Sequence, residues 1–314
     1  MKILVVSPAL AGYRWEIEIL ARSASQHAVA EEICWIAYTD ARSAAEDAAE
    51  CRALAERLGL SLTVYDDDRP LTRYPTSIRP YLIARWLRED PSRQRGVYYY
   101  CDSDLLFTGP IGFSAERLGP ESWLGSPTES YASLRPFILM GEQQLLSDLA
   151  TACRVPELSV YRAAGNAPGA QWLIQDPAPE IFDRVYAACE AAQPVLETSS
   201  VGRTWMTDMW VTPLVLRDEG ISASSDLRMA FTTLMDSYED FRACTVFHDS
   251  LRPLDIASRA LFDKDLWRAE PPFGRHHAVE ADNAVRGYLE YMCEIHPETT
   301  LELCLPSPES RETP

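Results

Sequence analysis

The segment from Val97 to Phe107 constrains the fold of this chain more than any other part of the sequence. Four residues that favour β-structure, Val-Tyr-Tyr-Tyr, lead into Cys-Asp-Ser-Asp, and apolar residues then resume as Leu-Leu-Phe. The pattern predicts a buried strand that carries two carboxylates, Asp102 and Asp104, at its C-terminal end. Ligands of open α/β sheets bind beyond the C-terminal ends of the strands, so we expect a binding site here.

The residues before this segment predict an α/β arrangement. An apolar run at 3–7 is typical of a first strand, the stretch 41–58 favours a helix that a glycine stops, and 60–65 favours a second strand. A strand, a helix and a strand in succession begin a right-handed βαβ sheet. We also expect a helix at 77–88, with apolar residues at helical spacing, directly before a strand at 96–100.

The second half of the chain alternates between shorter elements. Asp176 followed by a proline predicts an N-cap, and 178–191 is the helix that it would start. A second amphipathic helix is expected at 204–217, and a late strand at 244–247 leads into His248. The fold class that we predict is α/β, with a Rossmann-type mixed sheet flanked by helices and a C-terminal extension.

Composition limits the function classes. The chain of 314 residues has 47 acidic and 29 basic residues, a net charge of −18, and only two of the basic residues are lysines, Lys2 and Lys264. This acidity argues against a generic nucleic-acid binder, because neutralising phosphates needs surplus positive charge. The eight cysteines form no CxxC pair and are interpreted as reduced, mostly buried thiols. We find no signal peptide and no apolar run long enough to span a membrane, so we expect a cytoplasmic protein, in the host cytoplasm if the gene belongs to a phage.

The two carboxylates indicate a metal site. Hard oxygen donors with one short residue between them suit Mg²⁺ or Mn²⁺, which would bridge Asp102 and Asp104 to the phosphates of a substrate. We expect Asp104 to coordinate the ion directly, and Asp102 to share it or to hold a ribose. His248 lies 146 positions after Asp102 (248 − 102) but could reach the same ion from an adjacent strand. The alternatives are a solvated turn for the carboxylates and a structural role for the histidine.

Four segments, taken in order, resemble the GT-A-type glycosyltransferases with a DxD motif, in particular a phage-associated branch. The first is the DxD segment itself, and the others are similar to a segment against the donor sugar, to a Trp-Thr-x-Asp-Met-Trp helix start, and to a late strand ending in a metal-binding His. In this chain they read YYYCDSDLLF from Tyr98, NAPGAQW from Asn166, TWMTDMW from Thr204 and TVFHD from Thr245. The chain departs from the pattern at Pro168, where the family tends to Gly, and at Asp249, where Asn is common.

The resemblance covers roughly residues 1–265 and implies a catalytic domain there. We expect residues 266–302 to form a C-terminal extension that packs on this domain, and 303–314 to be a flexible tail. The family implies a divalent metal, Mn²⁺ or Mg²⁺, and a nucleoside-diphosphate sugar as donor, most often a UDP-sugar. It also implies the activity, that of a hexosyl- or pentosyltransferase.

Further residues are candidates for binding the donor. Arg79 would lie near the start of the helix at 77–88 and face the strand with the carboxylates, where a guanidinium suits a diphosphate. Arg85 and Arg88 are equally well explained by charge pairing on a solvated helix face. The donor-sugar segment contributes Gly169, Ala170 and Gln171, and Gln171 could contact the anomeric face of the sugar. For the nucleobase we expect the residues after the first strand, namely Ser7, Pro8 and Tyr13.

The catalytic base that we expect is Asp208. It lies between two tryptophans, and desolvation there would raise its pKa and suit it to accept a proton from an acceptor hydroxyl. The alternative is an N-cap or a buried polar partner. Inversion of the anomeric carbon would need such a base, whereas retention could place Gln171 beneath the sugar, and both residues are present. Weaker candidates for the acceptor side are Trp123, Ser126, Tyr131 and Trp205.

The acceptor is open at the level of sequence. The phage-associated branch suggests a 5-hydroxymethylated pyrimidine in DNA, flipped out of the stack. Arginines between positions 69 and 95, with Arg268, Arg275, His276 and His277, could form a basic track for the DNA backbone, and binding should then weaken steeply with salt. The alternatives are a glycan, a protein or a small alcohol as acceptor, a non-catalytic nucleotide-sugar binding module, and a metal-dependent phosphohydrolase.

Overall fold

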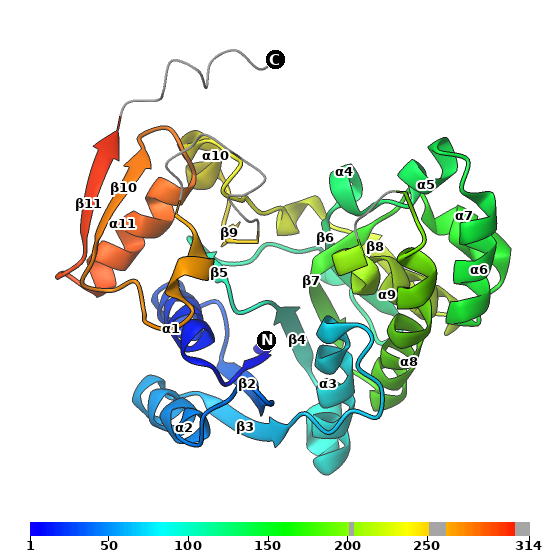
Figure 1. The fold of residues 1–314 in the computed structure, drawn as a ribbon, viewed down its shortest axis with the longest axis horizontal. Coiled ribbons are helices and arrows are strands. Elements are labelled where there is room, and N and C mark those ends of the chain that lie inside the picture. The colour runs from blue at the N-terminus through cyan, green and yellow to red at the C-terminus, as the bar shows by residue number, and fades with distance from the viewer. Residues whose placement is uncertain (201–203, 251–261, 305–314) are drawn as a thin grey trace.

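The computed structural model describes residues 1–200, 204–250 and 262–304, and a seven-stranded sheet forms its centre (Figure 1). The strand order is β3-β2-β1-β4-β7-β6-β8, in which β7 runs antiparallel to both β4 and β6 and the other neighbours are parallel. The predicted α/β class with a mixed sheet flanked by helices is confirmed. The strands are β1 (Lys2–Pro8), β2 (Glu32–Thr39), β3 (Ser61–Asp66), β4 (Val97–Cys101), β6 (Ser122–Pro127), β7 (Pro168–Gln175) and β8 (Ser222–Ser225).

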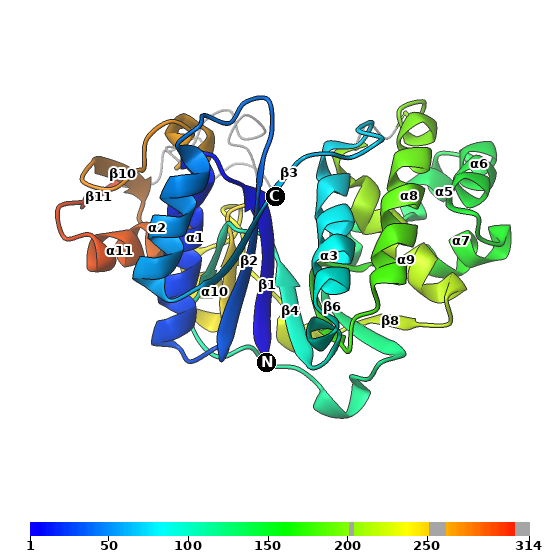
Figure 2. The same ribbon diagram turned by 90° about the horizontal axis from the view of Figure 1, so that it is seen from below.

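Helices cover both faces of the sheet (Figure 2). On β1, Ile3 and Val5 point into a core shared with α1 (Ala11–Gln26) and α2 (Asp47–Leu58). The alternate residues, Leu4 and Val6, pack in a second core with α3 (Ile78–Glu89) and α8 (Pro179–Leu196). Because side chains alternate across a strand, an unbroken apolar run such as 3–6 fills both cores at once.

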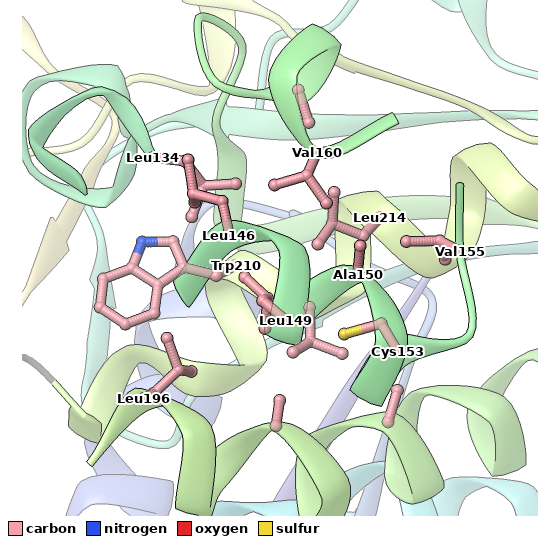
Figure 3. Packing of buried hydrophobic residues seen from close by; sticks show 14 of the residues in the cluster. Leu134, Leu146, Leu149, Ala150, Cys153, Val155, Val160, Leu196, Trp210 and Leu214 are labelled. Atoms are coloured by element: carbon pink, nitrogen blue, oxygen red, sulfur yellow. The ribbon is translucent and has the colours of Figure 1, made fainter. Parts of the chain in front are cut away.

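A cluster of helices packs beside α8. Its core contains Leu146, Leu149, Trp210 and Leu214, all at most 3% exposed (Figure 3). This packing fixes α9 beside α8, and α9 carries Asp208 in its first turn. The helices of the cluster are α4 (Glu129–Ala132), α5 (Arg135–Leu139), α6 (Gln143–Cys153), α7 (Glu157–Ala163) and α9 (Thr207–Asp218).

Two small sheets complete the other side of the molecule. The short strands β5 (Leu105–Phe107) and β9 (Val246–His248) pair antiparallel, and β10 (His276–Glu280) pairs with β11 (Thr300–Cys304). The helix α11 (Val285–Ile295) joins β10 to β11, and α10 (Tyr238–Ala243) precedes β9. Apolar side chains from α11 pack with Trp15 and Ile19 of α1 and with Phe247 of β9.

Several expected elements differ from the observed ones. The helix expected at 41–58 begins only at Asp47, and the 16-residue helix α1 follows the first strand, where the sequence did not predict a helix. Asp176 is not an N-cap: its carboxylate accepts the Gly96 N–H at 2.8 Å and its own N–H bonds the Gly96 carbonyl, so Asp176 links the start of β4 to the end of β7, and α8 begins at Pro179 instead. Of the predicted tail, Leu303 and Cys304 end β11, and residues 305–314 lie outside the described part of the chain.

All eight cysteines are free thiols and five are buried, which confirms the interpretation of the sequence. Within the three described stretches, no helix is both long enough and apolar enough to cross a membrane.

Candidate active site

Asp102, Asp104 and His248 converge beyond the C-terminal end of β4. The chain turns after Asp102 and enters β5, which pairs with β9 so that Leu105 lies opposite His248. This short ribbon brings the imidazole back to the carboxylates. His248 Nε2 lies 3.4 Å from Asp102 Oδ2 and 3.2 Å from Asp104 Oδ1. One potential ligand atom from each residue lies within 4.8 Å of the others.

The donor set fits a divalent cation. Asp104 Oδ1 and His248 Nε2 are buried and have no hydrogen-bond partner among the described residues, and they face each other. The amide nitrogen of Gln171 lies 3.2 Å from His248 Nδ1, while its buried Oε1 has no partner in the described part of the chain. A half-turn of that amide would let Oε1 accept the Nδ1–H and leave the Nε2 lone pair for a metal, the arrangement usual for metal-binding histidines. Two carboxylates and one imidazole suit Mn²⁺ or Mg²⁺.

The electrostatics of the three residues are coupled. Burial disfavours the charged form of His248, but Asp104 and Asp102 outweigh burial and raise the pKa of His248 to about 9. Burial also opposes the charge on Asp104, but Lys264 and His248 hold its pKa well below the usual range. For Asp102, Arg79 and His248 likewise lower the pKa against burial. Both carboxylates are therefore charged at neutral pH, the form in which they bind cations.

Two basic side chains contact these carboxylates. Arg79 Nη1 lies 2.6 Å from Asp102 Oδ1, so Arg79 on α3 faces the carboxylate strand as the sequence indicated. Lys264 forms a salt bridge with Asp104 and donates to the carbonyl oxygen of Asp249. Because positive charge is held on both sides of the carboxylates, an anionic group such as a diphosphate would meet Arg79 and Lys264 at the same place.

Two cavities meet at this group of residues. The larger is about 800 Å³ and the smaller about 630 Å³. Their shared walls contain Asp102, Asp104, Arg79, Thr76, Trp205 and Ser250. A ligand in one cavity can therefore approach a ligand in the other directly beside the carboxylates.

The smaller cavity lies over the C-terminal ends of β1 and β2. Ser7, Pro8 and Tyr13, the residues expected to bind a nucleobase, line it. Tyr38 near the end of β2 and Arg42 after that strand also line it, and Lys264 and Arg268 close it from the C-terminal part of the chain. This combination of aromatic rings and positive charge suits a base attached to phosphates.

The larger cavity has aromatic walls. Trp123 of β6, Trp172 of β7 and Phe182 of α8 form its inner end, where the Trp123 ring lies 6.1 Å from Trp172 and 5.7 Å from Phe182. Tyr131 and Trp205, both predicted for the acceptor side, line it as well, and so does Ala170. Trp205 is 58% exposed and lies in the walls of both cavities.

Asp208 also lines the larger cavity. Burial raises the pKa of its carboxyl, in part offset by Arg79 and Tyr74, which confirms the direction expected from the sequence. Its Oδ1 accepts a hydrogen bond from the Tyr74 hydroxyl at 2.6 Å, and Arg79 Nη1 lies 4.0 Å from Oδ2. Asp208 is not the N-cap of α9, because Met206 occupies that position.

Other predicted residues lie behind the cavity walls. Gln171 is fully buried against His248, between Ala170 and Trp172, which do line the larger cavity. Ser126 is also fully buried, and its hydroxyl donates to the carbonyl oxygen of Gly169. These side chains can act on a ligand only through the residues in front of them.

The expected basic track consists largely of paired charges. Arg69 pairs with Asp67, and Arg268 with Glu16 and Asp265. Arg85 pairs with Glu89 on its own helix, in line with the charge-pairing alternative, and with Asp68, whereas Arg88 pairs with Asp183 on α8. The remaining pairs are Arg93 with Asp90, Arg275 with Glu270, and His276 with Glu302, whereas His277 is buried against the Pro272 carbonyl oxygen.

Sequence reasoning did not select Lys264 or Glu16. Glu16 of α1 is 1% exposed, accepts the Ser103 hydroxyl at 2.6 Å and pairs with Arg268 at 2.8 Å. The middle residue of the Asp-Ser-Asp turn is thereby tied to α1. One signal in the sequence could have marked Lys264: it is one of only two lysines in the chain. Nothing in the local pattern marks Glu16, because its role depends on a contact across 87 positions.

Comparison with known proteins gives a likeness in structure but not in sequence. No protein-family model matches the chain, and no curated protein matches it. Among solved structures, it is similar to the galactosyltransferase LgtC in complex with donor and acceptor sugar analogs, with 14% identity, a TM-score of 0.47, and coverage of 80% of this chain and 87% of that one. It is also similar to the apo structure of the bifunctional glycosyltransferase WbbM, with 9% identity and a TM-score of 0.49 over 95% of this chain. The chain spans about half of WbbM, 51% of its length, and at these identities both likenesses concern the fold alone.

Proposed function

We propose that this protein transfers a sugar from a nucleoside-diphosphate sugar to an acceptor hydroxyl with the help of a divalent cation. The observation that carries the proposal is the position of Asp102, Asp104 and His248 at the wall shared by two cavities. One cavity offers aromatic and basic groups suited to a nucleotide, and the other offers a carboxylate beside aromatic walls. This is the arrangement that a transfer between two bound substrates requires.

The residues of the smaller cavity are assigned to the donor. Ser7, Pro8 and Tyr13 would contact the base, and Arg79 and Lys264 would contact the diphosphate. Asp102, Asp104 and His248 would hold the cation, either Mn²⁺ or Mg²⁺, which when bound supplies positive charge to the departing diphosphate. Gly169 and Ala170 would border the sugar, and Gln171 would hold the imidazole of His248.

Asp208 is assigned as the base. Its carboxylate would accept the proton of the acceptor hydroxyl as that oxygen forms its bond to the anomeric carbon. Support comes from its place in the wall of the larger cavity and from the raised pKa that burial produces. Arg79 lies near both Asp102 and Asp208, and its positive charge would reduce the repulsion between the two carboxylates.

For the acceptor we propose a 5-hydroxymethylated pyrimidine of DNA, extruded from the stack. The aromatic inner end of the larger cavity favours an acceptor with a planar ring, because such rings stack on tryptophan and phenylalanine. Most arginines of the expected basic track are already paired with carboxylates, so we assign recognition to the base rather than to the phosphates.

The central experiment measures sugar release from a set of nucleotide sugars, UDP-sugars first, with and without Mn²⁺. We expect Mn²⁺-dependent release with at least one donor, and Asp104→Ala should abolish it. Asp148→Ala is the control, because Asp148 is exposed on α6 and contacts only Gln144 among the described residues. Donor binding without turnover would instead favour a nucleotide-sugar binding module, and unchanged release by Asp104→Ala would remove Asp104 from the mechanism.

A second experiment tests the acceptor. The probes are an oligonucleotide with 5-hydroxymethylated pyrimidines, the same oligonucleotide without them, and a small set of glycans and simple alcohols. We expect sugar transfer only to the modified oligonucleotide. Transfer to a glycan or a simple alcohol in its place would contradict the DNA acceptor and leave the glycosyltransferase assignment standing.

A further inference from the structure

The two oxygens of Asp208 are not equivalent. Oδ1 accepts hydrogen bonds from the Tyr74 hydroxyl at 2.6 Å and from the Met209 N–H at 3.0 Å. Among the described residues, Oδ2 accepts no hydrogen bond, and its near neighbour is Arg79 at 4.0 Å. A carboxylate held through one oxygen keeps the other in a fixed place, where it can meet a proton from a bound hydroxyl.

Tyr74 reaches Asp208 from inside the protein. Its side chain is 2% exposed, and its hydroxyl lies 2.8 Å from the carbonyl oxygen of Trp205 as well as beside Asp208. Burial, with the nearby Asp208 carboxylate, raises the pKa of Tyr74 well above its usual value. The phenol therefore stays protonated at working pH and acts toward Asp208 only as a donor.

Glu190 of α8 holds the backbone N–H groups of Arg73 and Tyr74. This carboxylate is fully buried and accepts the N–H groups of Arg73 at 2.7 Å and Tyr74 at 3.2 Å, together with the Ser77 hydroxyl at 2.5 Å. A buried carboxylate without its donors is costly, so the loop cannot leave Glu190 without a large penalty. The Tyr74 ring is thereby anchored at its backbone end.

The contact of Glu190 with Ser77 also positions Arg79. Ser77 directly precedes α3, and Arg79 is the second residue of that helix. The bond between Ser77 and Glu190 therefore fixes the start of the helix from which Arg79 reaches Asp102. One buried carboxylate holds the segment that supplies partners to both Asp102 and Asp208.

We propose that Tyr74, anchored by Glu190, is a positioning residue that fixes the Asp208 carboxylate with Oδ2 free for the acceptor hydroxyl. The inference rests on the proposed function, since the orientation of Asp208 matters to transfer only if Asp208 is the base. It assigns a role to two residues that are buried behind the wall of the cavity rather than in it.

The test is Tyr74→Phe in the full-length chain, which removes one hydroxyl and keeps the ring. With Mn²⁺, a nucleotide sugar and the acceptor that wild type uses, we expect kcat to fall roughly ten- to hundredfold, the usual effect of losing a hydrogen bond to a charged, positioned group. The KM for the donor should stay unchanged, because Tyr74 does not line the donor cavity. A role in folding alone would lower stability without this split between kcat and KM.

Tyr98→Phe is the matched control. Tyr98 is also buried, and its hydroxyl donates to the carbonyl oxygen of Arg93 at 2.8 Å, far along β4 from the carboxylates. This variant should keep the kcat of wild type. The proposal is overturned if Tyr74→Phe also keeps it, or if both variants lose the same fraction of kcat.

A measurement without turnover separates this inference from the proposed function. The pKa of the Asp208 carboxyl, followed by carbon NMR, should rise in Tyr74→Phe because a donor to the charged form is lost. The other groups that face Asp208 stay in place, namely Arg79 of α3, Tyr100 of β4, Asp102 directly after β4, and Cys189 of α8. An unchanged pKa would overturn the role of Tyr74 even in an active enzyme. If the wild-type protein showed neither sugar transfer nor donor hydrolysis, the proposed function would be refuted. The NMR measurement would still report on the contact between Tyr74 and Asp208.

Discussion

Asp208 combines the properties that a general base needs at neutral pH. Burial raises the pKa of its carboxyl, while the charge of Arg79 and the hydrogen bond from Tyr74 act in the opposite direction. The carboxylate therefore binds a proton more strongly than that of an exposed aspartate does.

We predict that Asp208→Asn lowers kcat by roughly 10²- to 10⁴-fold, the usual contribution of a positioned base. Binding of Mn²⁺, followed by electron paramagnetic resonance, should be unaffected because Asp208 is outside the donor set. In wild type, kcat/KM should fall as the pH drops through the raised pKa of Asp208, since the base must be deprotonated. Asp218→Asn is the control on the same helix, because among the described residues its side chain pairs only with Arg184, at the surface. Full activity of Asp208→Asn would refute the assignment.

Individual site residues differ in how far sequence can predict them. Asp102 and Asp104 could be located because a buried strand and two carboxylates are a local pattern. The prediction of His248 required the family resemblance as well, because its approach to the carboxylates depends on the pairing of β5 with β9. Tyr74 and Glu190 could not be selected, because their contacts with Asp208 and with each other join the loop before α3 to α8 and α9.

Among the elements, β6 and β7 carry Trp123 and Trp172 of the aromatic cavity wall, and Gly125 lets the two strands approach each other. A Cβ at Gly125 would lie 2.7 Å from Pro168 Cβ and 2.8 Å from the Gly169 nitrogen. Pro168, a departure from the family pattern, starts β7 at this place, and the register of the strand pair shifts beside Gly125.

We predict that Gly125→Ala destabilises the protein by about 1–3 kcal/mol, the usual range for overpacking. Thermal unfolding followed by circular dichroism measures the effect. Gly165→Ala is the matched control, because a Cβ there meets no heavy atom of the described residues within 4 Å beyond its chain neighbours. Equal melting temperatures for the two variants would contradict the close packing of β6 on β7.

The end of β8 is held by a buried carboxylate. Asp226 accepts the N–H groups of Ser114 at 2.7 Å and Arg228 at 3.1 Å, and Arg117 lies 3.9 Å away. Burial opposes its charge, but these backbone bonds outweigh burial and lower its pKa.

Because the folded-state pKa of Asp226 is lowered, its contribution to stability is present above the unfolded value of about 3.9 and is lost as the pH falls through the folded value. We predict that Asp226→Asn costs about 1–3 kcal/mol at pH 7 and progressively less below pH 4. Urea unfolding between pH 3 and pH 7 checks this, with the exposed Asp148→Asn as control. A cost that stays constant over this range would show that the charge plays no part.

The regular elements were predictable where one periodicity dominates. The strands at 3–7, 60–65 and 96–100 and the helix at 77–88 have clear patterns, and the structure has β1, β3, β4 and α3 there. The helix α1 was missed because Trp-Glu-Ile-Glu-Ile at 15–19 alternates like a strand, and both glutamates are buried in ion pairs rather than exposed.

At the scale of the molecule, the net charge of −18 describes the surface better than the site. Most arginines that the sequence suggested as a basic track pair with neighbouring carboxylates, whereas Arg79 and Lys264 contact the site carboxylates themselves. The number of these charged residues can be read from the sequence, but their ion pairs cannot, because most partners lie on other elements. We therefore expect the ionic strength to affect donor binding more than the folding of the chain.

The C-terminal part of the chain shares its core with the site-bearing part. Leu289 of α11 is 1% exposed and belongs to one cluster with Trp15 of α1 and Phe247 of β9, the residue before His248. This cluster also contains Leu106, which follows the Asp-Ser-Asp turn. The ribbon that carries His248 is thus packed against α11 and its neighbours, and we infer that the extension beyond residue 265 unfolds together with the rest.

We predict that Leu289→Ala lowers the free energy of unfolding by about 2–5 kcal/mol, the range for a buried leucine. Urea unfolding followed by far-ultraviolet circular dichroism and by tryptophan fluorescence should give one transition, with both midpoints shifted equally, because the lost contacts belong to a shared core. Leu303→Ala, on the exposed side of β11, should leave both midpoints in place. If Leu289→Ala produced an early transition of its own while the main one stayed where it is in wild type, the extension would be an independent unit, and His248 would not depend on it.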